Sequence, residues 1–170
     1  MCATPLAPRH AHVLERRTGA LRCACVTCER VMVAPGTPWA PVRRRWNRID
    51  DFRLTDDQWR AFGLPIDLAF FFTRRGTGHV VVRYPSVAGT VECGLPLSAW
   101  NDVVAANAVL QMLEADGEAL LVNRLGTRRD YFIASIDECY RLVGLIRQHW
   151  RGFDGGPTAW AAIHGFFDGS

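Results

Sequence analysis

The sequence predicts an α+β fold in which antiparallel β-hairpins pack against helices, preceded by a small zinc-ribbon-like module. Three observations predict this arrangement. Short apolar runs rich in branched and aromatic residues alternate with glycine-containing turns. Other segments carry apolar residues at helical spacing behind capping residues. Three of the six cysteines also lie within residues 23–28, close to the start of the chain.

The N-terminal module is predicted from a hairpin pattern that runs into a cysteine pair. Residues 10–15 and 20–25 are expected to form two strands joined by a turn at residues 16–19. The second strand leads into Cys25 and Cys28, whose C-x2-C spacing lets both thiolates reach one metal ion. Cys23 lies two residues before Cys25, so a continuous strand would place both on one side. Such a hairpin is typical of a zinc ribbon.

Further possible ligands precede this pair. One more thiol lies near the start of the chain, and two histidines alternate along the first strand, so they are expected to share one face. The simplest site holds one structural zinc ion through Cys25, Cys28 and Cys2, completed by Cys23 or a histidine. Each histidine could equally be an exposed polar strand residue. The candidate metal ligands are Cys2, Cys23, Cys25, Cys28, His10 and His12.

The domain organisation follows from a change in composition after the module. Residues 34–48 contain Pro35, Pro38 and Pro41, which should break regular structure, and then three consecutive arginines between two tryptophans. The predicted boundaries are therefore 1–33 for the zinc-ribbon-like module, 34–48 for a Pro/Arg-rich linker and 49–170 for the α+β domain. Arginine interleaved with tryptophan could also bind a nucleic acid.

Strands of the main domain are expected at residues 66–73, 79–84, 89–93, 118–125 and 130–134, with helices between and after them. Thr55 with Gln58 forms a capping-box pattern, and Asp56 and Asp57 follow it as first-turn acids, so a catalytic carboxylate pair is not needed to explain them. Ser135 to Glu138 repeats the capping pattern before the longest helix. The last helix is expected to start at Pro157.

Composition and charge restrict the class of protein. The chain has 170 residues, of which 49% are hydrophobic and 22% charged, as in ordinary globular domains. Residues 1–48 carry nine arginines and two acids, whereas the remainder carries eleven arginines and fifteen acids. No secretory signal or membrane-spanning run is visible, so a cytoplasmic protein without a membrane span is expected. No nucleophile elbow, Walker sequence or H-E-x-x-H motif is present, so we do not expect an enzyme.

Several motifs together resemble an uncharacterised actinobacterial domain family. They are the Phe52-to-Trp59 segment, the Leu68-to-Phe72 run, the glycine-rich corner from His149 to Gly156, and the Cys23-x-Cys25-x2-Cys28 cluster. Members of that family are similar in having an N-terminal cysteine-rich ribbon and tend to be encoded beside NiFe uptake hydrogenase genes. The family pattern has a C-x2-C pair before the histidines, and only its second cysteine is present here, as Cys2. A late start codon or a lost ligand would explain this departure.

The resemblance implies an accessory role in making or serving a NiFe hydrogenase, through docking to a hydrogenase subunit or maturation factor. Two alternatives remain from the residues: an electron-transfer protein with iron–sulfur or rubredoxin-like iron on four thiolates, and a nucleic-acid-binding regulator. Specific nucleic-acid binding is not expected, because the positive N-terminal charge is offset elsewhere. Aromatic and arginine residues are enriched at interfaces. The candidate partner-binding residues are Trp39, Trp46, Trp150, Arg151 and Phe153.

Overall fold

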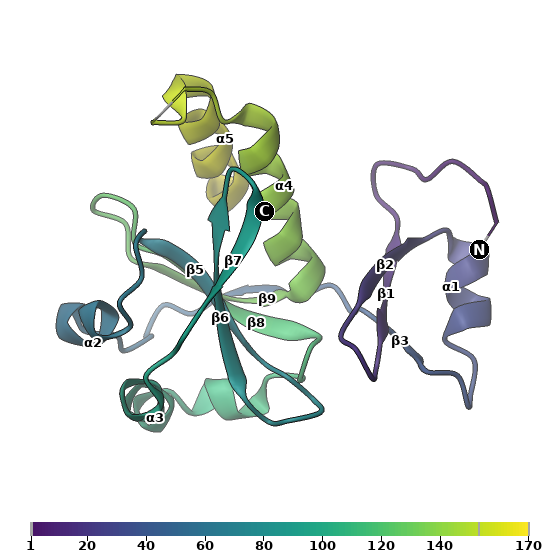
Figure 1. Cartoon of the computed structure of the whole chain (residues 1–170), viewed down its shortest axis with the longest axis horizontal. Helices are drawn as coiled ribbons and strands as arrows, with labels where there is room; N and C mark the ends of the chain where they lie inside the picture. The colour runs from purple at the N-terminus through teal and green to yellow at the C-terminus, as the bar shows by residue number, and fades with distance from the viewer. Residues whose placement is uncertain (1, 153, 170) are drawn as a thin grey trace.

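The computed structural model describes residues 2–152 and 154–169 and confirms an α+β fold with antiparallel sheets packed against helices (Figure 1). The strands form two sheets. A three-stranded sheet has the order β2-β1-β3, and a six-stranded sheet has the order β4-β9-β8-β5-β6-β7. Every strand pair in both sheets is antiparallel.

The small sheet and one short helix make up the N-terminal unit. Its elements are β1 (Ala11–Glu15), β2 (Leu21–Ala24), α1 (Val26–Met32) and β3 (Trp39–Pro41). In Figure 1 the small sheet lies between α1 on its outer side and the main body of the protein on its inner side. A two-sided position of this kind means that alternate residues of β1 and β2 face two different environments.

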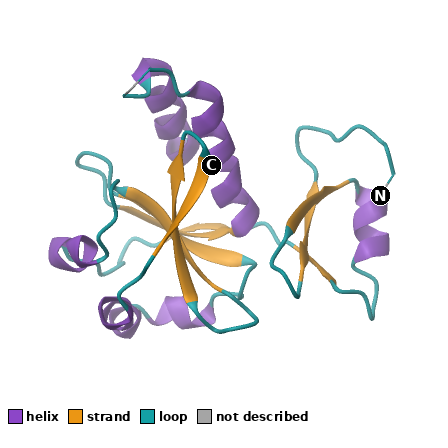
Figure 2. Ribbon diagram, in the orientation of Figure 1, coloured by secondary structure: helices purple, strands orange, loops and turns teal. Residues whose placement is uncertain are grey.

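The large sheet forms the centre of the main body. Its strands are β4 (Trp46–Arg48), β5 (Leu68–Thr73), β6 (Val80–Ser86), β7 (Gly89–Cys93), β8 (Glu118–Asn123) and β9 (Asp130–Ser135). The helices are α2 (Asp56–Ala61), α3 (Leu97–Ala106), α4 (Ile136–His149) and α5 (Gly156–Asp168), with a 3-10 helix, η1 (Ala108–Met112), after α3. Figure 2 shows α4 and α5 on one side of the sheet and α2 and α3 on the other. No helix among the described residues is long and apolar enough to cross a membrane.

Side chains of the central strands are buried on both faces of the large sheet. On β5, Phe70 and Phe72 pack in the core that α4 and α5 cover. Phe71, between them, points to the opposite core and stacks on Trp100 of α3 at 5.1 Å between ring centroids. Burial on both faces explains why this strand reads as a continuous apolar run and not as an alternating one.

The segment that we expected to lack regular structure contributes one edge strand to each sheet. Within residues 34–48, β3 pairs with β1 and β4 pairs with β9. The edge position of β3 explains how Pro41 is tolerated, because an edge strand has one side without ladder hydrogen bonds, whereas Pro35 and Pro38 precede the strand. Pro41 ends β3, and Val42 then packs against the core of the main body.

The two predicted capping boxes differ in outcome. At α2 both reciprocal hydrogen bonds between Thr55 and Gln58 form, as predicted. Ser135 takes the capping position of α4, but its side chain makes no capping bond. The carboxylate of Glu138, which would complete the box, is instead held by Arg44 at 3.0 Å and Arg141 at 2.5 Å. Ion pairing has therefore replaced the second capping box.

Candidate metal centre

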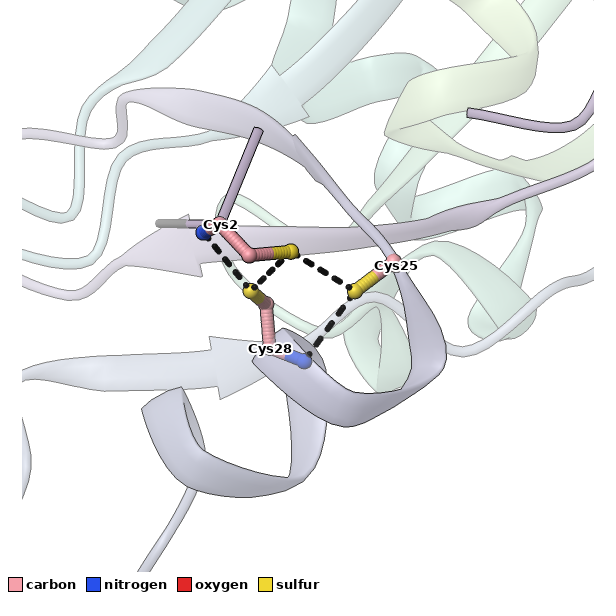
Figure 3. Close-up of side chains that lie close together, drawn as sticks. All are labelled: Cys2, Cys25 and Cys28. Carbon is pink, nitrogen blue, oxygen red and sulfur yellow. Dashed lines mark hydrogen bonds between the residues drawn. The ribbon is translucent and has the colours of Figure 1, made fainter. Parts of the chain in front are cut away.

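Three thiols meet at the outer end of the N-terminal unit (Figure 3). The Sγ atom of Cys2 lies 3.5 Å from that of Cys25 and 3.3 Å from that of Cys28. The backbone N–H of Cys2 also donates to Cys28 Sγ at 3.3 Å. Cys25 and Cys28, which are three positions apart in sequence, are thus joined by Cys2, which lies more than twenty positions upstream.

The local structure follows from the position of the C-x2-C pair at a helix start. Cys25 is the capping residue of α1, with an extended backbone, and its Sγ accepts a hydrogen bond from the backbone N–H of Cys28 at 3.4 Å. Sulfur here takes the place of the serine or aspartate oxygen that usually caps a helix. The first turn of α1 then directs Cys28 back toward Cys25, so a C-x2-C spacing becomes a pair of converging thiols.

Hydrogen bonding changes the acidity of these thiols. The side chain and backbone of Thr4, followed by Cys28 and Cys25, lower the pKa of Cys2 to about 6. The pKa of Cys28 is raised: the backbone of Cys2 lowers it, but hydrogen bonding with the Cys2 and Cys25 thiols outweighs that effect. One thiolate is therefore favoured at neutral pH beside a thiol that keeps its proton. A bound metal ion would favour loss of the remaining proton, because metal ions bind the deprotonated sulfurs.

The three thiols could hold a metal ion. Thiolate ligands suit zinc, copper(I) and iron–sulfur chemistry, whereas magnesium and calcium prefer oxygen. Three thiols therefore favour zinc, copper(I) or an iron–sulfur centre over magnesium and calcium, and they do not distinguish among the first three.

The remaining three candidate ligands form a separate group. His10, His12 and Cys23 offer ligand atoms that all lie within 4.8 Å of one another. We expected Cys23 and Cys25 to lie on one side of a continuous strand. Instead, β2 ends at Ala24, and Cys25 is the N-terminal capping residue of α1. The change from strand to helix separates the two cysteines, and the six candidate residues fall into two trios.

Strand register explains the second trio. His12 on β1 is directly opposite Cys23 on β2, so both project from the same face of the small sheet. His10 lies two residues before His12 and shares that face. Ala24, on the opposite face, is almost completely buried. The face that carries the histidines lines a cavity with residues of α4 and α5.

One residue beside this trio is contained in the second predicted capping pattern and has no predicted role of its own. Asp137, in the first turn of α4, has a carboxylate oxygen 3.0 Å from Nδ1 of His12, although the ring N–H is not aligned as in a hydrogen bond. Burial raises the pKa of Asp137, but contacts with His12 and Ser135 outweigh burial and place the pKa below its usual value. No local signal could link residues 12 and 137, because they meet only when the two sheets pack.

The predicted partner-binding tryptophans of residues 34–48 lie inside the fold to different degrees. Trp46 on β4 stacks on Phe132 at 4.6 Å and meets Phe166 edge-on at 5.2 Å between ring centroids. It is partly buried and packs against the core beneath α4 and α5, which explains an aromatic residue at this position without any partner. Trp39 on β3 is half-buried.

The corner after α4 is held largely by its own contacts. Trp150 is half-buried, and its ring lies 6.1 Å from that of Trp160. Arg151 is exposed, and its guanidinium donates to the carbonyls of Gln148 and Trp150 at 3.1 and 2.8 Å. Phe153, the fifth candidate, lies outside the described residues.

Comparison with known proteins gave one match. No curated protein and no solved structure matched the chain. A family model described as a family of unknown function, DUF5947, matched residues 1–170. Since this match covers the whole sequence, the N-terminal unit and the large sheet are parts of one family unit, and the chain belongs to the DUF5947 family.

Proposed function

We propose that this protein is a non-enzymatic accessory protein that binds zinc at Cys2, Cys25 and Cys28. In this proposal the zinc has a structural role in a zinc-ribbon-like N-terminal unit. The protein then acts by docking to a NiFe hydrogenase subunit or a protein of its maturation, in the cytoplasm. The convergence of the three thiols is the observation on which the metal-binding part rests.

A structural role for the metal is supported by how little else holds α1 in place. None of the seven residues of this helix is buried. Among residues 2–42, which the structure describes, the buried apolar side chains are those of Val13, Leu14, Ala24 and Ala40. Units with so small a core usually need a metal or a disulfide to fold stably. A zinc ion on Cys25 and Cys28 would fix the start of α1 and tie the N-terminal segment to it through Cys2.

The geometry favours zinc over a rubredoxin-like iron centre. Such a centre requires four thiolates on one iron atom. The described residues bring three thiols together, and Cys23 is on the sheet face that carries the histidines. A zinc ion accepts mixed sulfur and nitrogen ligands, so an added nitrogen donor can complete its tetrahedron.

The docking part of the proposal has two supports. The family resemblance suggests the partner, a NiFe hydrogenase subunit or maturation protein, and exposed apolar side chains suggest the surface that contacts it. Val26 and Val31, both on α1, are 61% and 69% exposed. Apolar residues on a metal-anchored helix are suited to contact another protein. Val26 and Val31 are added to the candidate docking residues, whereas Trp46 is partly buried and packs against the core.

Metal analysis of protein purified without added chelator tests the metal-binding part. Cys25→Ser and Cys28→Ser should each remove the thiol-bound zinc and lower the melting temperature. Cys93→Ser is the matched control, because Cys93 is half-buried and outside both trios. Stoichiometric iron with a visible charge-transfer band in the wild-type protein would instead favour the electron-transfer alternative.

The accessory role is tested in a host that uses a NiFe hydrogenase. Affinity purification of the tagged protein should recover hydrogenase or maturation proteins, and Val26→Asp with Val31→Asp should weaken recovery while the zinc content stays unchanged. If deletion of the gene leaves hydrogenase activity and its metal content unchanged, the accessory role is wrong.

A further inference from the structure

We propose that His10, His12 and Cys23 form a second metal site, independent of the three-thiol site and open on one side to a cavity. The proposal goes beyond the structural zinc described above, since it assigns a different set of ligands and a metal with an exchangeable position. Two imidazoles and one thiolate are a borderline donor set that suits divalent zinc, cobalt, nickel or copper.

The first support is that the fold itself brings the three side chains together. The register of β1 and β2 places His12 opposite Cys23, and the imidazole rings of His10 and His12 lie 4.7 Å apart between centroids. All three ligand atoms are within 4.8 Å of one another, a spacing that a single ion at ordinary bond lengths can span. Ligands on a paired hairpin are also more rigidly placed than ligands on loops.

The hydrogen bonding of His10 points to a missing ligand. Its Nδ1 lies 2.8 Å from the backbone carbonyl oxygen of Ala7, which can only accept, so the ring proton is on Nδ1. The lone pair is therefore on Nε2. This Nε2 atom is buried and has no hydrogen-bond partner among the described residues. A buried nitrogen with a free lone pair is costly unless something binds it, and a metal ion would do so.

Asp137 supports His12 in the way that carboxylates support metal-bound histidines. Its carboxylate is 3.0 Å from Nδ1 of His12 and not among the three clustered ligand groups. A proton on Nδ1, which faces the carboxylate, would leave the other ring nitrogen of His12 available for the metal. Carboxylate partners of this kind orient the imidazole and increase its basicity. Asp137 is therefore a positioning residue in this proposal and not a ligand.

The site lies at the joint between the small unit and the main body. A cavity of about 900 Å³ is lined there by the trio and by residues of α4 and α5, including Tyr140, Leu145 and Phe166. The lining carries three arginines, Arg9, Arg44 and Arg141, against the two carboxylates of Asp137 and Glu138, so its formal charge is about +1 with neutral histidines. Three protein ligands beside such a space leave a fourth position for water or a small molecule, which is the arrangement of exchangeable metal sites and not of closed structural ones.

The test measures metal stoichiometry in the full-length protein after removal of metal and titration with zinc. The wild-type chain should bind two zinc ions. His10→Ala and Cys23→Ala should each reduce this number to one, and Cys25→Ser should also reduce it to one while leaving the second site filled. His79→Ala is the matched control, because His79 is exposed and outside the trio. Since Cys23 is exposed, its substitution should preserve the fold even if that of His10 does not.

Cobalt as a probe distinguishes the two sites by their spectra. Sulfur-to-cobalt charge-transfer absorption grows with the number of thiolates, so the absorption lost in Cys23→Ala should be about one third of that lost when the three-thiol site is removed. Asp137→Asn should weaken zinc binding at the second site by about 10- to 100-fold without changing the stoichiometry at saturation.

Two results would overturn the proposal. One is a single zinc ion per wild-type chain that is lost in Cys25→Ser. The other is two zinc ions in both His10→Ala and Cys23→Ala. Failure of the three-thiol site alone would appear as one zinc that survives in Cys25→Ser and disappears in Cys23→Ala, so the two proposals can be distinguished.

Discussion

Arg45 and Glu118 form an ion pair in which Nη1 of the arginine lies 2.8 and 2.9 Å from the two carboxylate oxygens. The carbonyl of Arg45 also accepts a hydrogen bond from the backbone N–H of Ser135 at 2.9 Å. Its side chain and backbone thus both fix the segment that connects the two sheets. Arg44 adds a third anchor through Glu138. The connection is therefore attached to the main body by specific polar contacts.

Replacing Arg45 by alanine should lower the free energy of unfolding by about 1–3 kcal/mol, because Glu118 is mostly shielded from solvent and would lose its charged partner. Chemical denaturation measures this change. Arg43→Ala is the control, since Arg43 is exposed and should change stability by less than about 0.5 kcal/mol. Equal effects of the two substitutions would mean that the ion pair contributes nothing.

We expect the same contacts to limit nucleic-acid binding by the arginine run, residues 43–45. Arg44 and Arg45 are engaged by carboxylates, so of residues 43–45 one arginine remains without a described partner. We expect any DNA or RNA binding to be weak and to decrease steeply between about 50 and 200 mM salt, as counterion release requires. Fluorescence anisotropy with labelled single- and double-stranded oligonucleotides measures it. Submicromolar, sequence-selective binding at physiological salt would favour the regulator alternative instead.

The elements of the fold could be predicted because their signals are local. The hairpin before Cys25, the capping box at Thr55 and the apolar run of β5 each depend on neighbours within a few residues. The order of strands in the large sheet depends on contacts between distant segments, and nothing in residues 46–48 reveals that they pair with β9. Local patterns therefore predict elements better than they predict sheet edges.

The candidate metal ligands were found by residue type and spacing, but their division into two groups was not. The division depends on where β2 ends, and a shift of one residue at that point decides which side Cys25 faces. The alternation of His10 and His12 was a usable signal for one shared face. Pairing them with Cys23 additionally required the register of the hairpin, which its turn at residues 16–19 sets.

Trp46→Ala should destabilise the protein by about 2–4 kcal/mol, because the indole ring packs against Phe132, Phe166 and the neighbouring Phe167. Thermal or chemical denaturation measures the loss. Trp39→Ala should cost less, since no aromatic ring among the described residues contacts Trp39. A stable Trp46→Ala protein that fails only in partner recovery would restore Trp46 as a docking residue.

Thiol reactivity of the metal-free protein should follow the local environments of the cysteines. With a pKa of about 6, Cys2 is largely thiolate at neutral pH and should react first with iodoacetamide, and its rate should fall as the pH falls through 6. Burial, followed by the charges of Asp137 and Glu138, raises the pKa of Cys139, so this thiol should stay unmodified until the protein unfolds. Peptide mapping by mass spectrometry identifies the modified residues.

Zinc should protect Cys2 from this labelling and leave the half-buried Cys93 unaffected, because of these two only Cys2 belongs to a candidate metal group. Fast labelling of Cys2 that zinc does not slow would show that this thiol is not a ligand of the bound metal.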